Sequence, residues 1–346
     1  MFFYLVLFFS ACLFAFLYSR EKRQHVAILW KFICFSILFI PAALRFNVGV
    51  DYPTYAKIFN YIANGVPILV EPGYWFLNYA VFKLNGGFQI VVAFCSFFTL
   101  LFVFLSFPKK HFLSCIAIFF LVFYPWTYTT IRQMLVASLA YYCYIHYFLN
   151  GKFLRSYLIF AFAAVFHLSA LIYIPIFFLL RYIRINKIYA FLFFTLVLVT
   201  APVADIIIGF FEIALANTKY SVYFSMDSMS GKPAEISTGI GRIVRFFLYT
   251  LILLPLVIYR DKRAASDGLV LFLIVIVFDV LAQHIVVFSR ISRGFLFAYF
   301  ILIVAILESK SKYRQIVVLS IFALSFVLYI GNLYNEQNLP YQTIAF

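Results

Sequence analysis

The chain has 346 residues, of which 66% are hydrophobic and only 11% are charged, and its formal net charge is +15. Soluble domains carry about 25% charged residues, so this composition excludes a water-soluble globule and predicts an integral membrane protein. A basic chain could bind nucleic acid, but there is no soluble basic face to do so, and no nucleic-acid partner is expected.

Long apolar runs divide the chain into predicted membrane spans of about 20 residues, the length needed to cross the hydrocarbon core. Apolar runs bounded by polar or turn residues predict ten spans, at 2–18, 26–44, 88–107, 112–128, 131–149, 188–208, 243–259, 268–289, 291–307 and 316–330. The first lacks a preceding basic segment and is expected to be a retained helix rather than a signal peptide. The predicted fold is an all-α, polytopic membrane helical bundle that forms one integral membrane domain, 1–346.

Lysines and arginines cluster in six short loops, which the positive-inside rule assigns to the cytoplasm. A single span between the clusters at 152–155 and 181–187 would place them on opposite sides of the membrane. We therefore predict a re-entrant hairpin at 156–182 with His167 at its tip, which requires a wet or protein-lined cavity there. One span kinked at Pro175 is the alternative.

The longer connections then lie on the external side. The segment 45–87 is predicted to be an external loop that contains an interfacial helix at 71–84, where aromatic and polar residues alternate. The segment 209–242, rich in Ser, Gly, Met and Lys, is predicted to be an external loop or lid.

Ionisable residues outside the basic loops gather at the predicted external helix ends. They are Arg45, Asp51, Glu71, Arg132, His167, Arg242, Arg245, Arg290 and Arg293. Charges at the membrane edge are costly and indicate function, although snorkelling to the interface is the rival explanation for any one arginine. Several arginine forks on one face can hold a diphosphate without a metal. Neither a D-x-D pair, an H-E-x-x-H motif nor a P-loop occurs, so no metal and no cofactor is expected.

The segment that follows the second predicted span combines Arg45, Asp51, Tyr52 and Tyr55. Aromatic faces stack on sugar rings, and carboxylate and phenol oxygens bond to sugar hydroxyls. This loop is therefore a candidate sugar cradle. An interfacial aromatic belt is the alternative, and it explains the tyrosines but not the Arg and Asp.

Several short motifs in chain order resemble those of EpsG-like, Wzy-type polysaccharide polymerases. They are R-x3-G-x-D-Y-x2-Y at 45–55, E-P-G-Y at 71–74, I-R-Q at 131–133, F-H-x-S-A-L at 166–171, S-R-I-S-R at 289–293, and the tail residues Asn338, Pro340, Tyr341 and Phe346. The resemblance implies a bundle like that of the GT-C lipid-phosphosugar glycosyltransferases. It also implies a metal-independent enzyme that moves an O-antigen or exopolysaccharide repeat unit from one undecaprenyl diphosphate carrier to another.

The roles of individual residues follow from that chemistry. The leaving diphosphate needs positive charge and the acceptor hydroxyl needs a base. The base candidates are His167, Asp51 and Glu71. The expected substrate-binding residues are Arg45, Tyr52, Tyr55, Tyr74, Arg132, Arg242, Arg290, Arg293 and Tyr341. The resemblance places the protein in a bacterial cytoplasmic membrane with its site facing outward, among membrane lipid and alongside chain-length regulator and flippase proteins. An exporter or flippase of lipid-linked oligosaccharide, a membrane acyltransferase, or a nonenzymatic scaffold for polysaccharide assembly remain alternatives.

Overall fold

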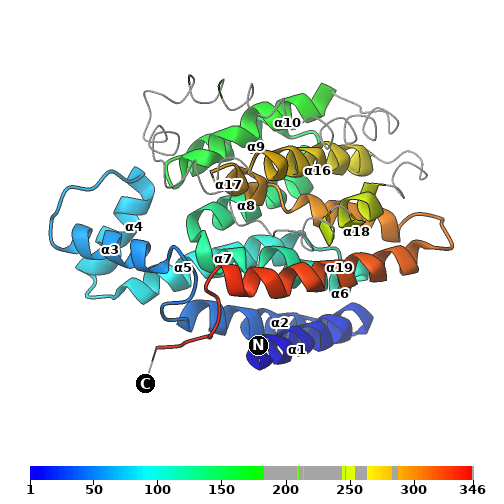
Figure 1. Cartoon of the computed structure of the whole chain (residues 1–346), viewed down its shortest axis with the longest axis horizontal. Helices are drawn as coiled ribbons and strands as arrows, with labels where there is room; N and C mark the ends of the chain where they lie inside the picture. Colours follow the sequence, from blue (N-terminus) through cyan, green and yellow to red (C-terminus); the bar gives the residue numbers. More distant parts are fainter. Residues whose placement is uncertain are drawn as a thin grey trace. The chain divides into compact units, whose positions relative to one another are not determined.

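A computed structural model describes residues 1–182, 209, 213, 244–245, 247–253, 263–282 and 287–344. These residues form helices and no named strand (Figure 1), so the predicted all-α class is confirmed. The chain divides into two compact units, one of residues Met1–Arg181 with Tyr329–Phe346 and the other of Tyr182–Leu328. Each unit is described by itself.

The first unit contains most of the described helices. They are α1 (Phe2–Arg20), α2 (Gln24–Leu44), α3 (Tyr52–Ala63), α4 (Pro72–Lys83), α5 (Phe88–Ser106), η1 (Lys109–His111), α6 (Phe112–Ile118), η2 (Phe119–Phe123), α7 (Trp126–Thr129), α8 (Ile131–Cys143), η3 (Tyr144–Phe148), α9 (Phe153–Ala163), η4 (Leu168–Ile172) and α10 (Tyr173–Tyr182). The second contains α16 (Arg263–Leu281), α17 (Val287–Gly294) and α18 (Ala298–Leu307). Helix α19 (Arg314–Asn335) begins in the second unit and ends in the first.

Within the described residues, five helices are long and apolar enough to cross a membrane: α1, α2, α5, α16 and α19. The pair α17–α18, bent by 43°, adds a sixth if it is one span. This is fewer than the ten predicted spans. The predicted span 188–208 lies outside the described residues, and so does part of 243–259. The predicted span 112–128 is interrupted, because a π-helical turn and Pro125 follow α6.

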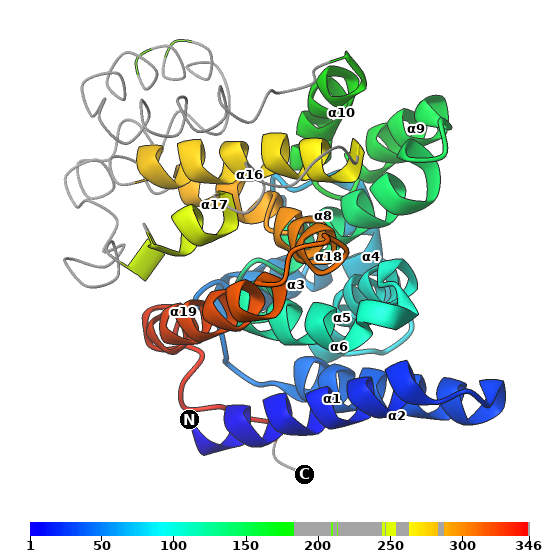
Figure 2. The ribbon, with the colours of Figure 1, turned by 90° about the vertical axis from the view of Figure 1, so that its right-hand side faces the viewer.

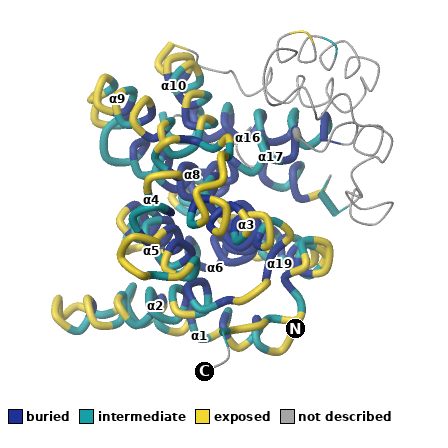
Figure 3. Tube along the Cα trace, turned by 90° about the vertical axis from the view of Figure 1, so that its left-hand side faces the viewer, coloured by how far each residue is buried: buried dark blue, intermediate teal, exposed yellow. Residues whose placement is uncertain are grey.

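Helices α1 and α2 form an antiparallel pair that lies side by side in Figures 1 and 2, and α2 also packs against α5. Small residues, among them Ala11 and Ala15, are fully buried in this packing, which lets the helices approach closely. Large apolar side chains such as Phe2, Phe9 and Phe32 are exposed instead. Figure 3 shows exposed stretches, in yellow, along this helix pair. An apolar face without a protein partner is what contact with lipid requires.

The segment expected to be a sugar-cradling loop contains a helix, α3. Tyr55, Ile58, Phe59 and Ile62 are all buried, and their i, i+3, i+4, i+7 spacing is that of an amphipathic helix. A proline in the first turn favours the start of such a helix. The polar residues of this segment indicated a loop, whereas the spacing of its apolar residues is that of a helix. Helix α4 coincides with the helix predicted at 71–84, and its location at the membrane interface stays a prediction.

A hydrophobic cluster joins α3, α4, α5 and α8. Its members include Tyr55, Tyr74, Val91 and Leu135, and Phe166 packs against it from the segment after α9. The cluster fixes the starts of α4 and α8 relative to each other, because buried side chains in close packing have little room to shift.

Helices α9 and α10 form a hairpin. The Phe160 ring of α9 lies 4.9 Å from the Phe177 ring of α10, and the Arg181 guanidinium lies 4.8 Å from the centre of the Phe153 ring. The two ends of the segment therefore lie together, and the turn around His167 lies at the other end. The re-entrant insertion of 156–182 into a membrane stays a prediction.

The C-terminal tail is fastened to the end of α2 and the loop that follows it. Arg45 and Thr343 form an isolated antiparallel bridge, and the Gly49 N–H donates to the Gln337 carbonyl at 3.2 Å. The Tyr4 hydroxyl of α1 donates to the backbone oxygen of Asn338 at 2.8 Å. The first and last segments of the chain thus stabilise each other.

Position 49 requires glycine for two reasons: the backbone conformation there, and the lack of room for a side chain. Its φ is +97°, and a Cβ added there would lie 2.5 Å from the Tyr128 carbonyl oxygen. We expect Gly49→Ala to lower the thermal unfolding temperature in detergent. Gly65→Ala is the matched control, because Gly65 has φ +69° but nothing within 4 Å of the added Cβ. The control substitution should cost only the left-handed penalty of about 1–2 kcal/mol. Equal shifts for the two variants would contradict the close contact with Tyr128.

Candidate functional site

Glu71, Arg132 and His167 meet in the first unit, although they come from three separate stretches of sequence. Arg132 Nη1 donates to Glu71 Oε2 at 2.5 Å, and His167 Nδ1 lies 3.5 Å from Glu71 Oε1. The side chains are 14%, 7% and 18% exposed for Arg132, Glu71 and His167 respectively. The Glu71 carboxylate therefore bridges a guanidinium and an imidazole in a largely buried setting.

Each member of the cluster is placed by the start of a helix. Glu71 is the N-cap residue of α4, Arg132 is the second residue of α8, and His167 is the N-cap residue of η4. Residues at helix starts point from a rigid element towards the space beyond its end, so three helix starts can direct three side chains to one point. The spacing of the motifs in sequence does not indicate this convergence.

Gly73 allows the start of α4 to approach the turn that carries His167. Its N–H donates to the Val165 carbonyl at 2.8 Å, and a Cβ at this position would lie 3.0 Å from that oxygen. Only a residue without a side chain fits such an approach comfortably. The E-P-G-Y and F-H-x-S-A-L motifs are thus two sides of one backbone contact.

Aromatic rings flank the Arg132 guanidinium. Its centre lies 4.6 Å from the Tyr74 ring and 5.5 Å from the Tyr55 ring, and Phe166 packs edge-on against Tyr74. Rings within about 6 Å of a cation attract it and also restrict its movement. Burial raises the pKa of the Tyr74 hydroxyl well above its ordinary value, so this tyrosine stays protonated.

The charges of the cluster keep Glu71 ionised. Burial raises the pKa of the carboxyl, but the hydrogen bond with His167 and the positive charge of Arg132 outweigh burial and hold the pKa well below its ordinary value. A carboxylate with so low a pKa is a weak proton acceptor. Glu71 is therefore suited to orienting its two neighbours.

Arg45 was predicted to bind substrate. Its side chain is fully buried, and it does not belong to this cluster. Its guanidinium donates to the Ala42 carbonyl and to Ser96 Oγ and the Thr127 carbonyl at 3.3 Å each. It also lies 4.8 Å from the centre of the Tyr128 ring. These contacts brace the end of α2 against α5 and the segment before α8.

Tyr52 and Tyr341, two other predicted site residues of this unit, make hydrogen bonds with residues outside the cluster. Asp51 is the half-buried N-cap residue of α3. The Tyr52 hydroxyl donates to Gln89 Oε1 at 3.1 Å, and the Tyr341 hydroxyl donates to the Pro41 carbonyl at 2.9 Å. Of the predicted site residues, the cluster unites Glu71, Arg132, His167, Tyr55 and Tyr74.

The remaining predicted arginines lie outside the residues of the first unit. Arg290 and Arg293 are half-buried residues of α17 in the second unit, and Arg242 lies outside the described residues. The predicted lid at 209–242 is also undescribed except for two isolated positions. Within the first unit, Arg132 is the predicted substrate-binding arginine that belongs to the cluster.

The second unit contains a polar network that the sequence analysis missed. Asp279 of α16 accepts hydrogen bonds from Arg245 Nη1 at 2.9 Å, from Ser292 Oγ at 2.8 Å and from the Tyr249 hydroxyl. Asp279 is the one acidic residue of the predicted span 268–289. A charge inside an apolar span indicates function or a buried partner. This pattern alone could have indicated Asp279 from the sequence.

Metal ligands do not gather in the part of the chain that is described. No group of three or more His, Cys, Asp or Glu side chains is placed to hold a metal ion among those residues. The five cysteines are present as thiols, and four of them are buried.

Comparison with known proteins gives one match. The EpsG family matches residues 28–343, which is nearly the whole chain and includes all members of the cluster. No curated protein and no solved structure matches the chain significantly.

Replacing Glu71 tests the bridge through its pH dependence. Because its pKa is lowered in the folded protein, its ionisation contributes stability above the ordinary carboxyl pKa of 4.5, and that contribution declines as pH falls below it. We expect Glu71→Gln to lower the unfolding temperature in detergent at pH 7, with a gap to wild type that narrows below about pH 4.5. Glu21→Gln, in the exposed pair with Arg23, is the control and should change stability little. A gap independent of pH would contradict the bridge.

Proposed function

This chain belongs to the EpsG family, and we propose that it is a polysaccharide polymerase of the Wzy type. Family membership and the apolar helices make it a polysaccharide-polymerase-like membrane protein. The proposed reaction transfers an oligosaccharide repeat unit from one undecaprenyl diphosphate carrier to the end of another at the outer face of the bacterial cytoplasmic membrane. The observation that carries the proposal is the cluster of Glu71, Arg132 and His167.

Arg132 is the proposed diphosphate ligand. A guanidinium has five N–H donors in a planar fork, so Arg132 can hold Glu71 and still donate to phosphate oxygens. The Tyr74 and Tyr55 rings fix its orientation. A cation held in place before the reaction stabilises the charge that develops on the leaving diphosphate without reorganisation. Arg242, Arg290 and Arg293 are proposed as further ligands.

His167 is the proposed general base. With its Nδ1 side towards the Glu71 carboxylate, the imidazole presents Nε2 for proton transfer, as when a carboxylate orients a catalytic histidine. The acceptor hydroxyl oxygen forms a bond to the anomeric carbon of the donor sugar. The bond from that carbon to the diphosphate oxygen breaks, and the hydroxyl proton moves to His167. Glu71 acts as a positioning residue.

The other parts of the proposal follow from the family and the sequence. The positive-inside rule applied to the basic loops supports an external location of the cluster, where lipid-linked repeat units become available. A flippase that delivers those units and a chain-length regulator are the proposed partners. Metal independence is also proposed, because arginine charge takes the place that a divalent cation has at other diphosphate sites.

The first test is polymerisation by the purified protein supplied only with an undecaprenyl-diphosphate repeat unit, in the presence of EDTA. Wild type should extend chains. Arg132→Ala and His167→Ala should each lose about 100-fold or more of the rate, the effect of removing a charge stabiliser or a base.

The matched controls are Arg20→Ala and His146→Ala. Arg20 is exposed at the end of α1, and His146 contacts the Leu105 carbonyl outside the cluster. Both should retain activity. No extension by wild type, or cluster variants as active as these controls, would overturn the proposal.

The pH dependence separates the base from its positioning residue. If His167 accepts the proton, activity should rise with pH as the imidazole loses its proton. Glu71→Gln removes a negative charge that stabilises the protonated imidazole. The rise of kcat/KM with pH should therefore occur at lower pH in this variant than in wild type. The same pH dependence of kcat/KM in wild type and Glu71→Gln would argue against the pairing of Glu71 with His167.

A further inference from the structure

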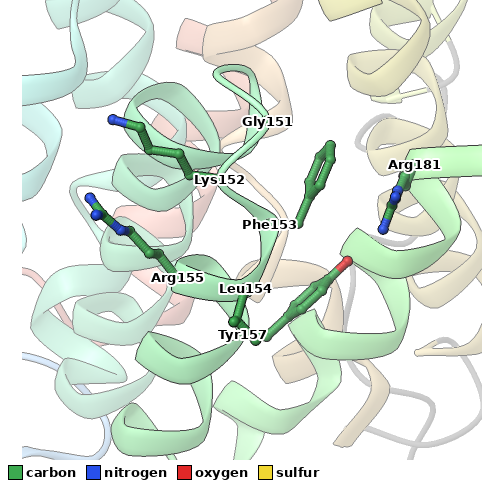
Figure 4. Close-up of a pocket in the computed structure, with 7 residues that line it drawn as sticks. All are labelled: Gly151, Lys152, Phe153, Leu154, Arg155, Tyr157 and Arg181. Carbon is green, nitrogen blue, oxygen red and sulfur yellow. The ribbon is translucent and has the colours of Figure 1, made fainter.

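Basic residues that line one hollow need not act together. The hollow at the open end of the α9–α10 hairpin is lined in part by Lys152, Arg155 and Arg181. Arg181 lies 4.8 Å from the centre of the Phe153 ring, and Figure 4 shows Lys152 and Arg155 on the other side of the start of α9. These three cations therefore do not converge on one point.

Helix α17 of the second unit brings two arginines to one side. Arg290 and Arg293 are half-buried and three residues apart, so they lie only about 60° from each other around the helix. The buried residues of α17 include Phe288, Ser289 and Ser292. Ser292 lies about 160° around the helix from Arg290 and about 100° from Arg293. The serine thus occupies the buried side of α17, and the two arginines share another side.

The buried side of α17 is tied to α16 through Ser292. Its hydroxyl donates to Asp279 Oδ1 at 2.8 Å and lies 3.3 Å from the Val275 carbonyl oxygen. The other carboxylate oxygen, Asp279 Oδ2, accepts from Arg245 Nη1 at 2.9 Å and from the Tyr249 hydroxyl. Because both of its oxygens are engaged, the carboxylate is a fixed point against which Ser292 is held.

We propose that Asp279 is a positioning residue: by holding Ser292 it sets the rotation of α17 about its axis, and thereby the direction in which Arg290 and Arg293 are presented. This role rests on the proposed function, in which the two arginines are further ligands of the diphosphate.

The length of α17 makes such a hold necessary. The helix has eight residues, and a helix this short is marginally stable by itself, so its orientation depends on contacts with its neighbours. A guanidinium bonds to phosphate oxygens through a rigid, directional fork. A misplacement of about 1 Å can cost on the order of 100-fold in rate, and a rotation of α17 would displace both forks together.

The test changes the donors around Asp279. Replacing Asp279 itself would leave the Arg245 charge without its partner and destabilise the fold. Ser292→Ala removes the donor that α17 supplies and keeps the Arg245 pair. Tyr249→Phe is the matched control, because it removes another neutral donor to the same carboxylate from residues 247–253, outside α17.

Binding of farnesyl diphosphate to the purified full-length protein in detergent is measured by isothermal titration calorimetry, with farnesol as the probe that lacks the diphosphate. Arg290→Ala and Arg293→Ala should each weaken farnesyl diphosphate binding about tenfold, the scale of one lost charge-assisted hydrogen bond. Ser292→Ala should weaken it about fivefold or more, because both guanidinium groups lose their alignment. Tyr249→Phe should stay within about twofold of wild type, and farnesol binding should not change in any variant.

A combined variant tests whether Ser292 acts through the arginines. Adding Ser292→Ala to Arg290→Ala/Arg293→Ala should cost no further affinity for farnesyl diphosphate, because the groups that the serine positions are already absent. A further loss in the triple variant would mean that Ser292 acts in another way and would overturn the inference.

Three other outcomes would overturn it. One is wild-type affinity in Ser292→Ala while the arginine variants lose affinity, which leaves the proposed diphosphate ligands in place. Another is equal loss in Ser292→Ala and Tyr249→Phe, which would mean that the network acts on the fold as a whole. The third is wild-type affinity in Arg290→Ala and Arg293→Ala, which would also remove these two arginines from the proposed function. The polymerisation assay of Arg132→Ala and His167→Ala tests the reaction separately.

Discussion

Glu71 supplies the negative charge on which the described site depends. It is the only acidic residue between Asp51 and Asp205, in a stretch that contains many lysines and arginines. A guanidinium as buried as that of Arg132 needs a counter-charge, because burying an unpaired charge costs several kcal/mol. One carboxylate meets that need and faces His167 as well. The starts of α4, α8 and η4 are arranged around this single residue.

The family-like motifs of the first unit divide into two structural groups. E-P-G-Y, I-R-Q and F-H-x-S-A-L contribute side chains or backbone to the cluster. The segment from Arg45 to Gly49 and the tail around Asn338 fasten the end of α2, the loop after it and the C-terminus to one another. Tyr55 belongs to the first motif, and its ring also flanks the Arg132 guanidinium. A residue of such a motif can thus be a buried structural residue that holds helices together as readily as a member of the proposed site.

The two described polar networks differ in how their carboxylate is satisfied. Asp279 accepts from Arg245, Tyr249 and Ser292, and two of these donors are neutral hydroxyls. Glu71 faces a guanidinium and an imidazole that can exchange a proton. A carboxylate surrounded by fixed donors fits a structural network, whereas one beside a titratable ring fits proton transfer. This difference is the reason that the proposed chemistry is assigned to the first unit.

The sequence by itself determined the membrane class, the helical fold, the positions of α1, α2, α4, α5 and α19, and the residue types of the site. Those features follow from local apolar length and from the cost of a charge near lipid. Only the tertiary structure distinguished the roles of two arginines. Arg45 is buried and holds helices together, whereas Arg132 contacts Glu71 in the cluster that includes His167. The tertiary structure also placed Tyr52 on Gln89 and Tyr55 against Arg132, although both belong to one helix. The physical reason is that a contact between residues some 60 to 100 positions apart depends on how helices pack, and one sequence read locally does not contain that information.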